Sequence, residues 1–228
     1  MTSLPAIPDA LAGQLINLCA AIMLLLGFAM LAQRRILSLI NLFMLQGLVL
    51  FASTVIVAHT TQQSHLYWSA GLTLTLKVIA LPYILHRLIR KLSVKWDVET
   101  IINIPTTMLV GIALVVVAFN VAQPISQLSG TIMRATVGIA LACVLLSFLM
   151  MITRSKAVPQ VIAFLAMENG LFFAATSATY GMPMVVELGI ALDVLVGMVI
   201  FGVFFFQIRE QFDSLDIRHL EKAKEEEA

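Results

Sequence analysis

The chain has 228 residues, of which 60% are hydrophobic and only 12% are charged, whereas about 25% of the residues of a soluble domain carry a charge. This composition excludes an ordinary soluble domain and predicts a membrane protein. The 14 Lys and Arg residues nearly balance the 13 Asp and Glu residues, so the net charge of +1 indicates neither nucleic-acid binding nor an acidic tail.

Seven mostly apolar stretches are each long enough for a helix across the hydrocarbon core, which takes about 20 residues. No Lys or Arg precedes the first stretch, which argues against a cleavable signal peptide. The sequence predicts an all-α, polytopic membrane protein, with a seven-helix transmembrane domain over residues 1–206 and a tail over residues 207–228. The predicted helices are, in chain order, 11–33, 36–59, 67–88, 104–123, 132–152, 160–180 and 184–206.

Basic residues outside the predicted helices are expected on one side of the membrane. Of the 14 Lys and Arg residues, Lys77 and Arg134 fall within helices, and the other twelve lie at the C-terminal end of an odd-numbered helix, as Arg87 does, or after one. Because Lys and Arg accumulate in cytoplasmic loops, this pattern predicts an N-terminus outside and a C-terminal tail in the cytoplasm. The twelve residues are Arg34, Arg35, Arg87, Arg90, Lys91, Lys95, Arg154, Lys156, Arg209, Arg218, Lys222 and Lys224.

Four of the ionisable side chains inside predicted helices are Lys77, Glu168, Glu187 and Asp193, and such a group costs roughly 2.5–3.5 kcal/mol at mid-depth. At about 1.5 Å per residue, Lys77, Glu168 and Asp193 lie roughly 15, 18 and 14 Å from the outer ends of their helices. These three side chains are therefore expected near one plane in the middle of the membrane. Glu187 and Arg134 each lie within about one turn of the outer end of their helices, so they could form an ion pair.

The mid-membrane charges allow two interpretations. In the first, Lys77 is neutralised by Glu168 or Asp193 and holds three helices together. In the second, the acid that this pairing leaves over can titrate, and the three groups form part of a lateral proton path. Pro82, five residues after Lys77, removes the hydrogen bond to the Val78 carbonyl and predicts a kink beside the lysine.

Cysteines and histidines give no indication of a cofactor. Cys19 and Cys143 are isolated within apolar stretches and the four histidines are scattered, so no haem, iron–sulfur or metal site is expected. His86, at the inner end of the third predicted helix, is either an interfacial anchor or the group that exchanges protons with the cytoplasm.

Short segments in three predicted helices and in the tail share a family pattern. They are Lys77-Val78 with Pro82, Met167-Glu168-Asn169-Gly170, Val186-Glu187-Leu188-Gly189-Ile190-Ala191 through Asp193, and Ser214-Leu215-Asp216-Ile217. These segments resemble the hydrogenase-4 component E family. The resemblance covers most of the chain, and its specificity is concentrated between residues 159 and 220.

The resemblance implies a fold and roles for two acids. Members of the family are multi-spanning subunits of membrane-bound nickel–iron hydrogenase and formate hydrogenlyase complexes related to respiratory complex I. Part of the family is similar to the K-type subunit of complex I and to the C subunit of multisubunit sodium/proton antiporters. By this resemblance Glu168 takes the role of the intramembrane glutamate of the proton path. Asp193 takes the acidic position on the following helix, where a second glutamate would be expected.

The resemblance also implies partners and a location. The expected partners are antiporter-like membrane subunits, a quinone-subunit homologue, and soluble subunits that hold all nickel–iron and iron–sulfur centres. The chain itself is expected to hold no cofactor, to catalyse no reaction on its own, and to lie in a bacterial or archaeal plasma membrane.

The leading hypothesis is therefore a non-redox membrane subunit that couples electron transfer to proton or sodium movement, with Glu168, Asp193 and Lys77 in the ion path. The alternative is a scaffold subunit that links antiporter-like subunits to the quinone-subunit homologue and conducts no protons. A stand-alone seven-helix receptor or transporter is disfavoured, because the outer loops are short and the last helix has no lysine for a retinal-type Schiff base.

Overall fold

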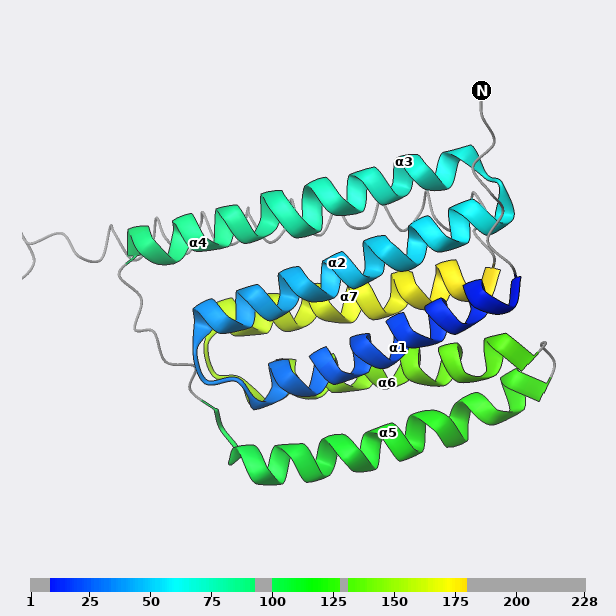
Figure 1. The fold of residues 1–228 in the computed structure, drawn as a ribbon. Helices are drawn as coiled ribbons and strands as arrows, with labels where there is room; N and C mark the ends of the chain where they lie inside the picture. The colour runs from blue at the N-terminus through cyan, green and yellow to red at the C-terminus, as the bar shows by residue number, and fades with distance from the viewer. Residues whose placement is uncertain (1–8, 93–99, 128–130, 180–228) are drawn as a thin grey trace, which may run out of the picture. The chain divides into compact units, whose positions relative to one another are not determined.

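The computed structural model describes residues 9–92, 100–127 and 131–179, which fold into helices (Figure 1). Thr100 and Arg154 form an isolated antiparallel bridge, and the described residues contain no strand. The predicted all-α fold is thus confirmed for the described residues. In chain order the elements are α1 (Asp9–Ala32), α2 (Ile36–Thr61), α3 (Ser64–Thr73), η1 (Leu74–Ala80), α4 (Leu81–Leu92), α5 (Ile104–Gln127), α6 (Thr131–Thr153) and α7 (Ala157–Thr179).

Within the described ranges, six segments are long and apolar enough to cross a membrane. Each begins and ends within four residues of the corresponding predicted helix. The segments are Leu11–Ala32, Ile36–Thr61, Leu66–Arg87, Ile104–Pro124, Thr136–Thr153 and Val158–Thr176. The seventh predicted helix (184–206) and the tail (207–228) lie outside the described residues, so the seventh crossing and the orientation of the termini stay predictions.

The third membrane segment is continuous but changes its hydrogen bonding in the middle. The α-helix α3 leads directly into the π-helix η1, which leads into α4, and we call these three elements the composite helix. Leu81 donates its N–H to the carbonyl of Leu76, five residues earlier. Pro82 follows as the second residue of α4 and has no N–H to donate. The sequence predicts a kink at this proline, and the structure has wider π turns immediately before it, with Lys77 in their middle.

Four helices, α1, α2, α6 and α7, form the centre of the bundle. Helix α1 contacts α2 and α6, and α7 contacts the same two helices. Helix α5 packs on α6 and α1, whereas the composite helix packs on α2, so these two lie on opposite sides of the centre (Figure 1). Phe43 and Phe173 are buried in the centre, while α5 exposes apolar side chains such as Leu109 and Val116. Exposed apolar side chains on a membrane-spanning helix are suited to contact with lipid.

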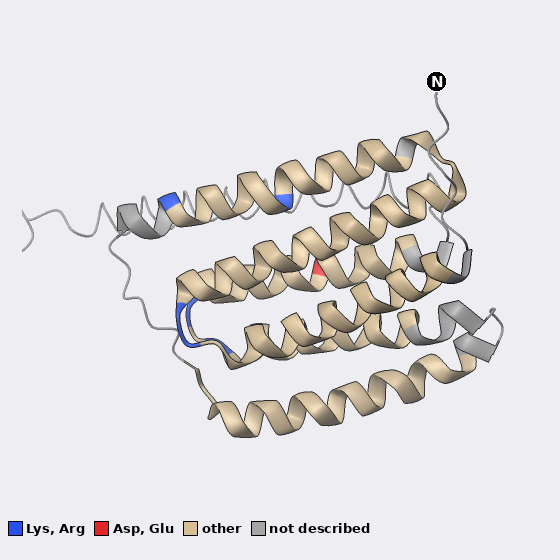
Figure 2. Cartoon of the chain, in the orientation of Figure 1, with Lys and Arg blue, Asp and Glu red and all other residues tan. Residues whose placement is uncertain are grey.

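Basic residues of the described helices and connections gather mostly at one end of the bundle (Figure 2). The connection between α1 and α2, with Arg34 and Arg35, lies at this end, as does the connection between α6 and α7, with Lys156 (Figure 1). This gathering agrees with the pattern from which the orientation was predicted. That this end faces the cytoplasm stays a prediction.

Candidate functional site

Two of the three charges predicted near mid-membrane face each other in the structure. The Nζ atom of Lys77, on η1, lies 4.0 Å from the Oε2 atom of Glu168, on α7. Both residues are buried, Lys77 with 2% and Glu168 with 5% of its surface exposed. Each lies near the middle of its membrane segment, Leu66–Arg87 and Val158–Thr176 respectively. A base and an acid therefore meet about halfway along the spanning helices.

The surroundings of this pair leave the carboxylate poorly hydrogen-bonded. Neither oxygen of Glu168 has a hydrogen-bond partner among the described residues, and the 4.0 Å separation from Lys77 exceeds a hydrogen bond. The Lys77 Nζ atom also lies 5.5 Å from the centre of the Phe172 ring, within range of a cation–π interaction. The charged pair and a neutral pair of these groups differ only in the position of one proton. The arrangement can therefore take part in proton exchange.

Close packing between η1 and α2 positions Lys77. Gly47 of α2 faces the lysine, and a Cβ atom built on Gly47 would lie 3.4 Å from the Lys77 Cβ atom and 3.4 Å from the Val78 Cγ2 atom. These are ordinary van der Waals distances, so the gap between the two helices at Gly47 would just admit a methyl group. The lysine backbone is thereby held directly against α2.

Two buried amides stand next to these contacts. Gln46 precedes Gly47 on α2, Asn169 follows Glu168 on α7, and Asn169 Nδ2 donates a hydrogen bond of 3.2 Å to Gln46 Oε1. Both amides have 0% of their surface exposed. Gln46 Nε2 and Asn169 Oδ1 have no hydrogen-bond partner among the described residues. We call Gln46, Lys77, Glu168 and Asn169 the polar cluster.

Sequence analysis missed Gln46 and gave Asn169 no role of its own. A signal for Gln46 was present, because an amide in the middle of an apolar stretch requires a hydrogen-bond partner. Its partner, however, comes from a helix 123 residues away. Only the packing of α2 against α7 brings the two amides together.

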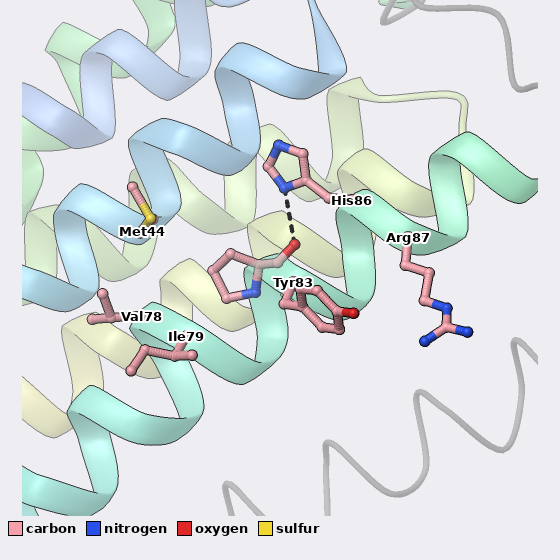
Figure 3. Close-up of a pocket in the computed structure, with 7 residues that line it drawn as sticks. Met44, Val78, Ile79, Tyr83, His86 and Arg87 are labelled. Carbon is pink, nitrogen blue, oxygen red and sulfur yellow. Dashed lines mark hydrogen bonds between the residues drawn. The ribbon is translucent and has the colours of Figure 1, made fainter.

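His86 lies in α4 beside a groove between the composite helix and α2 (Figure 3). Its Nδ1 atom donates a hydrogen bond of 2.9 Å to the Pro82 carbonyl. His86 follows Lys77 by nine positions, roughly 13 Å of helix, so a proton cannot pass directly between them. The role of His86 in proton uptake stays a prediction. The groove, about 880 Å³ in volume, is lined by Met44, Val78, Ile79, Pro82, Tyr83, His86 and Arg87.

Three other predicted site residues are not placed by the structure. Asp193 and Glu187 lie outside the described residues, and for Arg134 only the helical backbone within α6 is described. The third mid-membrane charge and the outer ion pair between Arg134 and Glu187 therefore stay predictions. Among the residues that the structure describes, no three His, Cys, Asp or Glu side chains gather as metal ligands.

Arg154 corrects the sequence analysis, which grouped it with the solvated charges of the loops. Only 1% of its surface is exposed. Its Nη2 atom donates hydrogen bonds to the carbonyls of Met30 (3.2 Å) and Leu31 (2.8 Å) at the end of α1. Carbonyls in the last turn lack partners within their own helix, and a positive charge suits that end of the helix dipole. Burial lowers the pKa of the Arg154 guanidinium to about 10, so it stays charged at neutral pH.

Known proteins of two kinds are similar to the chain. It is 27% identical over 212 residues to the uncharacterized protein Rv0085 of Mycobacterium tuberculosis, covering 92% of this chain and 96% of that protein. It is 24% identical over 159 residues to hydrogenase-4 component E of Escherichia coli and of Shigella flexneri, covering 70% of this chain and 73% of those proteins. No family model and no solved structure matches the chain. The protein is thus a helical membrane protein with distant homology to hydrogenase-4 component E.

Proposed function

We propose that this protein is a membrane subunit of a hydrogenase-like, complex I-related assembly and that it carries part of a proton path running within the membrane plane. Lys77 and Glu168 form the exchange site in the middle of the membrane, and Asp193 belongs to the same path. The observation that carries the proposal is the buried pair with its 4.0 Å separation. Distant homology to hydrogenase-4 component E supports membership in a multisubunit complex.

A buried acid–base pair can couple the arrival of one proton to the departure of another. When Glu168 takes up a proton, the negative charge nearest the Lys77 ammonium in the ion pair is removed. Less negative charge beside a buried ammonium disfavours its charged form, so the ammonium then tends to release a proton to the next acceptor. Lysine suits this role because its charge state adjusts readily to its surroundings. The pair thereby passes on protons without a redox centre in this chain.

The proposed partners supply the redox chemistry and the rest of the path. They are antiporter-like membrane subunits, a quinone-subunit homologue, and soluble subunits with nickel–iron and iron–sulfur centres, assembled in a bacterial or archaeal plasma membrane. Affinity purification in mild detergent, followed by identification of the co-purified subunits, tests this assignment. Recovery of a stable, lone chain would contradict it.

The decisive experiment for the proton path is Glu168→Gln in the complete complex, reconstituted into liposomes. Glutamine matches the size of glutamate but cannot take up a proton, so proton translocation should be lost while electron transfer continues. Thr176→Val on the same helix is a matched control, because the buried Thr176 hydroxyl bonds only to carbonyls of its own helix. Normal proton translocation by fully assembled Glu168→Gln complex would refute the proposed path.

A scaffold function is the second candidate, and one observation favours it. The Lys77–Glu168 pair joins η1 to α7, two elements whose backbones do not contact each other. In that case Glu168→Gln should lower the yield of assembled complex, and the complex that does assemble should translocate protons normally. Measuring assembly and translocation on the same preparation separates the two functions.

A further inference from the structure

We infer that Gln46 and Asn169 are positioning residues that hold water beside the Lys77–Glu168 pair, and that this water carries the proton across the gap between the lysine and the glutamate. The inference rests on the proposed function and deepens it. It assigns a role to two buried amides that the mid-membrane charges alone do not explain.

Unsatisfied hydrogen-bonding atoms are the first observation. Gln46 Nε2, Asn169 Oδ1 and both carboxylate oxygens of Glu168 are buried without a hydrogen-bond partner among the described residues. Buried polar atoms in folded proteins are nearly always satisfied, and water does this where protein groups cannot. The set comprises one amide donor and three acceptors, which suits water because it can both donate and accept.

Contacts between three elements bring the residues that carry these atoms into one neighbourhood. Gly47 faces Lys77 across the interface of α2 with η1. The next residue back along α2, Gln46, bonds to Asn169 of α7. The neighbouring residue on α7, Glu168, faces Lys77 again. These contacts place all four residues of the polar cluster where α2, η1 and α7 come together.

A water molecule in this region completes a balanced proton transfer. After Lys77 has released its proton, the O–H bond of the Glu168 carboxylic acid breaks as a new O–H bond forms on the water. Another O–H bond of that water breaks as the Lys77 amine gains its proton, which restores the carboxylate and the ammonium and leaves an unchanged water. The amides of Gln46 and Asn169 neither gain nor lose a proton, so they orient the water and are not catalytic residues.

Other buried polar side chains on the same helices do not fit this role. The hydroxyl of Thr54 on α2 donates to the Leu50 carbonyl, and that of Thr176 on α7 donates to the Phe172 carbonyl. Both hydroxyls are thereby satisfied within their own helices. These threonines provide matched controls for the two amides.

The test uses the complete complex with Gln46→Met and Asn169→Leu, which keep side-chain size but remove the hydrogen-bonding atoms. Proton translocation per electron should fall by about tenfold or more, since misplacing a transfer group has effects of this order. Thr54→Val and Thr176→Val should leave it unchanged. Infrared difference spectra should show bands shifted by water labelled with oxygen-18 in the unaltered complex and in the threonine controls, but not in the amide variants.

Several outcomes would overturn the inference. If Gln46→Met and Asn169→Leu translocate normally while Glu168→Gln does not, the water-holding role is wrong and the proposed function stands. If all three translocate normally, the proposed function fails as well. If the amide variants do not assemble, a high-resolution cryo-EM map of the unaltered complex decides. Absence of ordered water density within hydrogen-bond distance of Gln46 Nε2 and Asn169 Oδ1 would then overturn the inference.

Discussion

Lys77 and Arg154 are both buried cations, but they meet different groups. Arg154 donates two hydrogen bonds to carbonyls at the end of α1. Lys77 faces the carboxylate of Glu168, and the two form the ion pair found between described residues. Carbonyl groups do not titrate, whereas a carboxylate does. The chemistry of the partner, rather than burial itself, therefore distinguishes a charge that completes a helix end from one that can exchange a proton.

The two side chains also differ in how firmly they hold their charge. The pKa of Arg154 is lowered by burial to about 10, which leaves the guanidinium charged at neutral pH. Lysines are the cations that proteins use where a proton must come and go. The position of each residue agrees with this difference, because Lys77 lies within its membrane segment and Arg154 follows the end of its segment.

Removing the lysine should have the largest effect. In Lys77→Met the Glu168 carboxylate remains buried without its counter-charge, so the free energy of unfolding should fall by about 3–5 kcal/mol. The double variant with Glu168→Gln should recover most of this loss. Thermal unfolding of this subunit within the purified complex in detergent measures both effects, with the exposed Arg34→Met as a control. A double variant no more stable than Lys77→Met would show that the two side chains do not act as a pair.

Removing the arginine should affect stability but not proton movement. Arg154→Met removes a donor from two carbonyls of α1, of which that of Met30 still accepts from the Gln33 N–H, so the free energy of unfolding should fall by about 1–3 kcal/mol. Arg154→Lys keeps the positive charge, so its free energy of unfolding should fall by less than that of Arg154→Met. Proton translocation per electron by the assembled complex should stay unchanged, and its loss in either variant would contradict the distinction drawn between the two cations.

The stability effect of Arg154→Met should also be independent of pH near neutrality. The pKa of the guanidinium in the folded protein, about 10, lies below its usual value of 12.5. Between these two values the unfolded chain binds the proton that the folded protein lacks, so stability rises with pH there. At about pH 6–8 both states keep the proton, and the destabilisation should be constant. Thermal unfolding at several pH values in this range checks the expectation.

Substitutions of Gly47 should probe how closely Lys77 is held. Gly47→Ala places a Cβ atom at contact distance from Lys77 and Val78, while alanine favours the helix, so the net change in unfolding free energy should stay within about 1 kcal/mol. Gly47→Leu overfills the interface and should cost about 1–3 kcal/mol. It should also reduce proton translocation by moving Lys77 away from Glu168. If Gly47→Ala and Gly47→Leu have the same unfolding free energy and the same proton translocation, the interface is looser than its distances indicate.

His86→Gln should have the smallest effect on the proton path. Glutamine cannot titrate, but we expect water in the groove beside this residue to deliver protons in its place, so the translocation rate should fall by less than about tenfold. The decrease should be strongest at alkaline pH, where protons are scarce. Rates measured across a pH series check this expectation, and an unchanged profile would assign His86 to interfacial anchoring.

Features that depend on one helix at a time could be predicted from the sequence. Apolar runs predicted both ends of six membrane-spanning helices to within four residues, because crossing a membrane sets the length and the composition of a helix. The constant rise per residue placed Lys77 and Glu168 at a similar depth. Pro82 marked the place where the backbone departs from an α-helix, although not that the departure takes the form of π turns.

Features that depend on contacts between helices could not be predicted. Gln46 and Asn169 meet only because α2 packs against α7. Arg154 follows directly after a membrane segment, as loop arginines commonly do, and nothing in the sequence indicates that its side chain turns inward to α1. The sequence offers Glu168 and Asp193 as alternative partners of Lys77, but it does not indicate that Lys77 meets Glu168 across helices whose backbones lie apart.

The hydrogen bond between His86 and Pro82 also determines the tautomer of the histidine. A carbonyl oxygen can only accept, so the ring nitrogen 2.9 Å from it, Nδ1, must carry a hydrogen. In the neutral ring the lone pair then resides on Nε2. A proton that reaches His86 is therefore bound at Nε2, and the imidazolium can release it from the same atom while its bond to Pro82 stays intact. Proline, which donates no backbone hydrogen bond, here defines the direction in which a neighbouring side chain can exchange a proton.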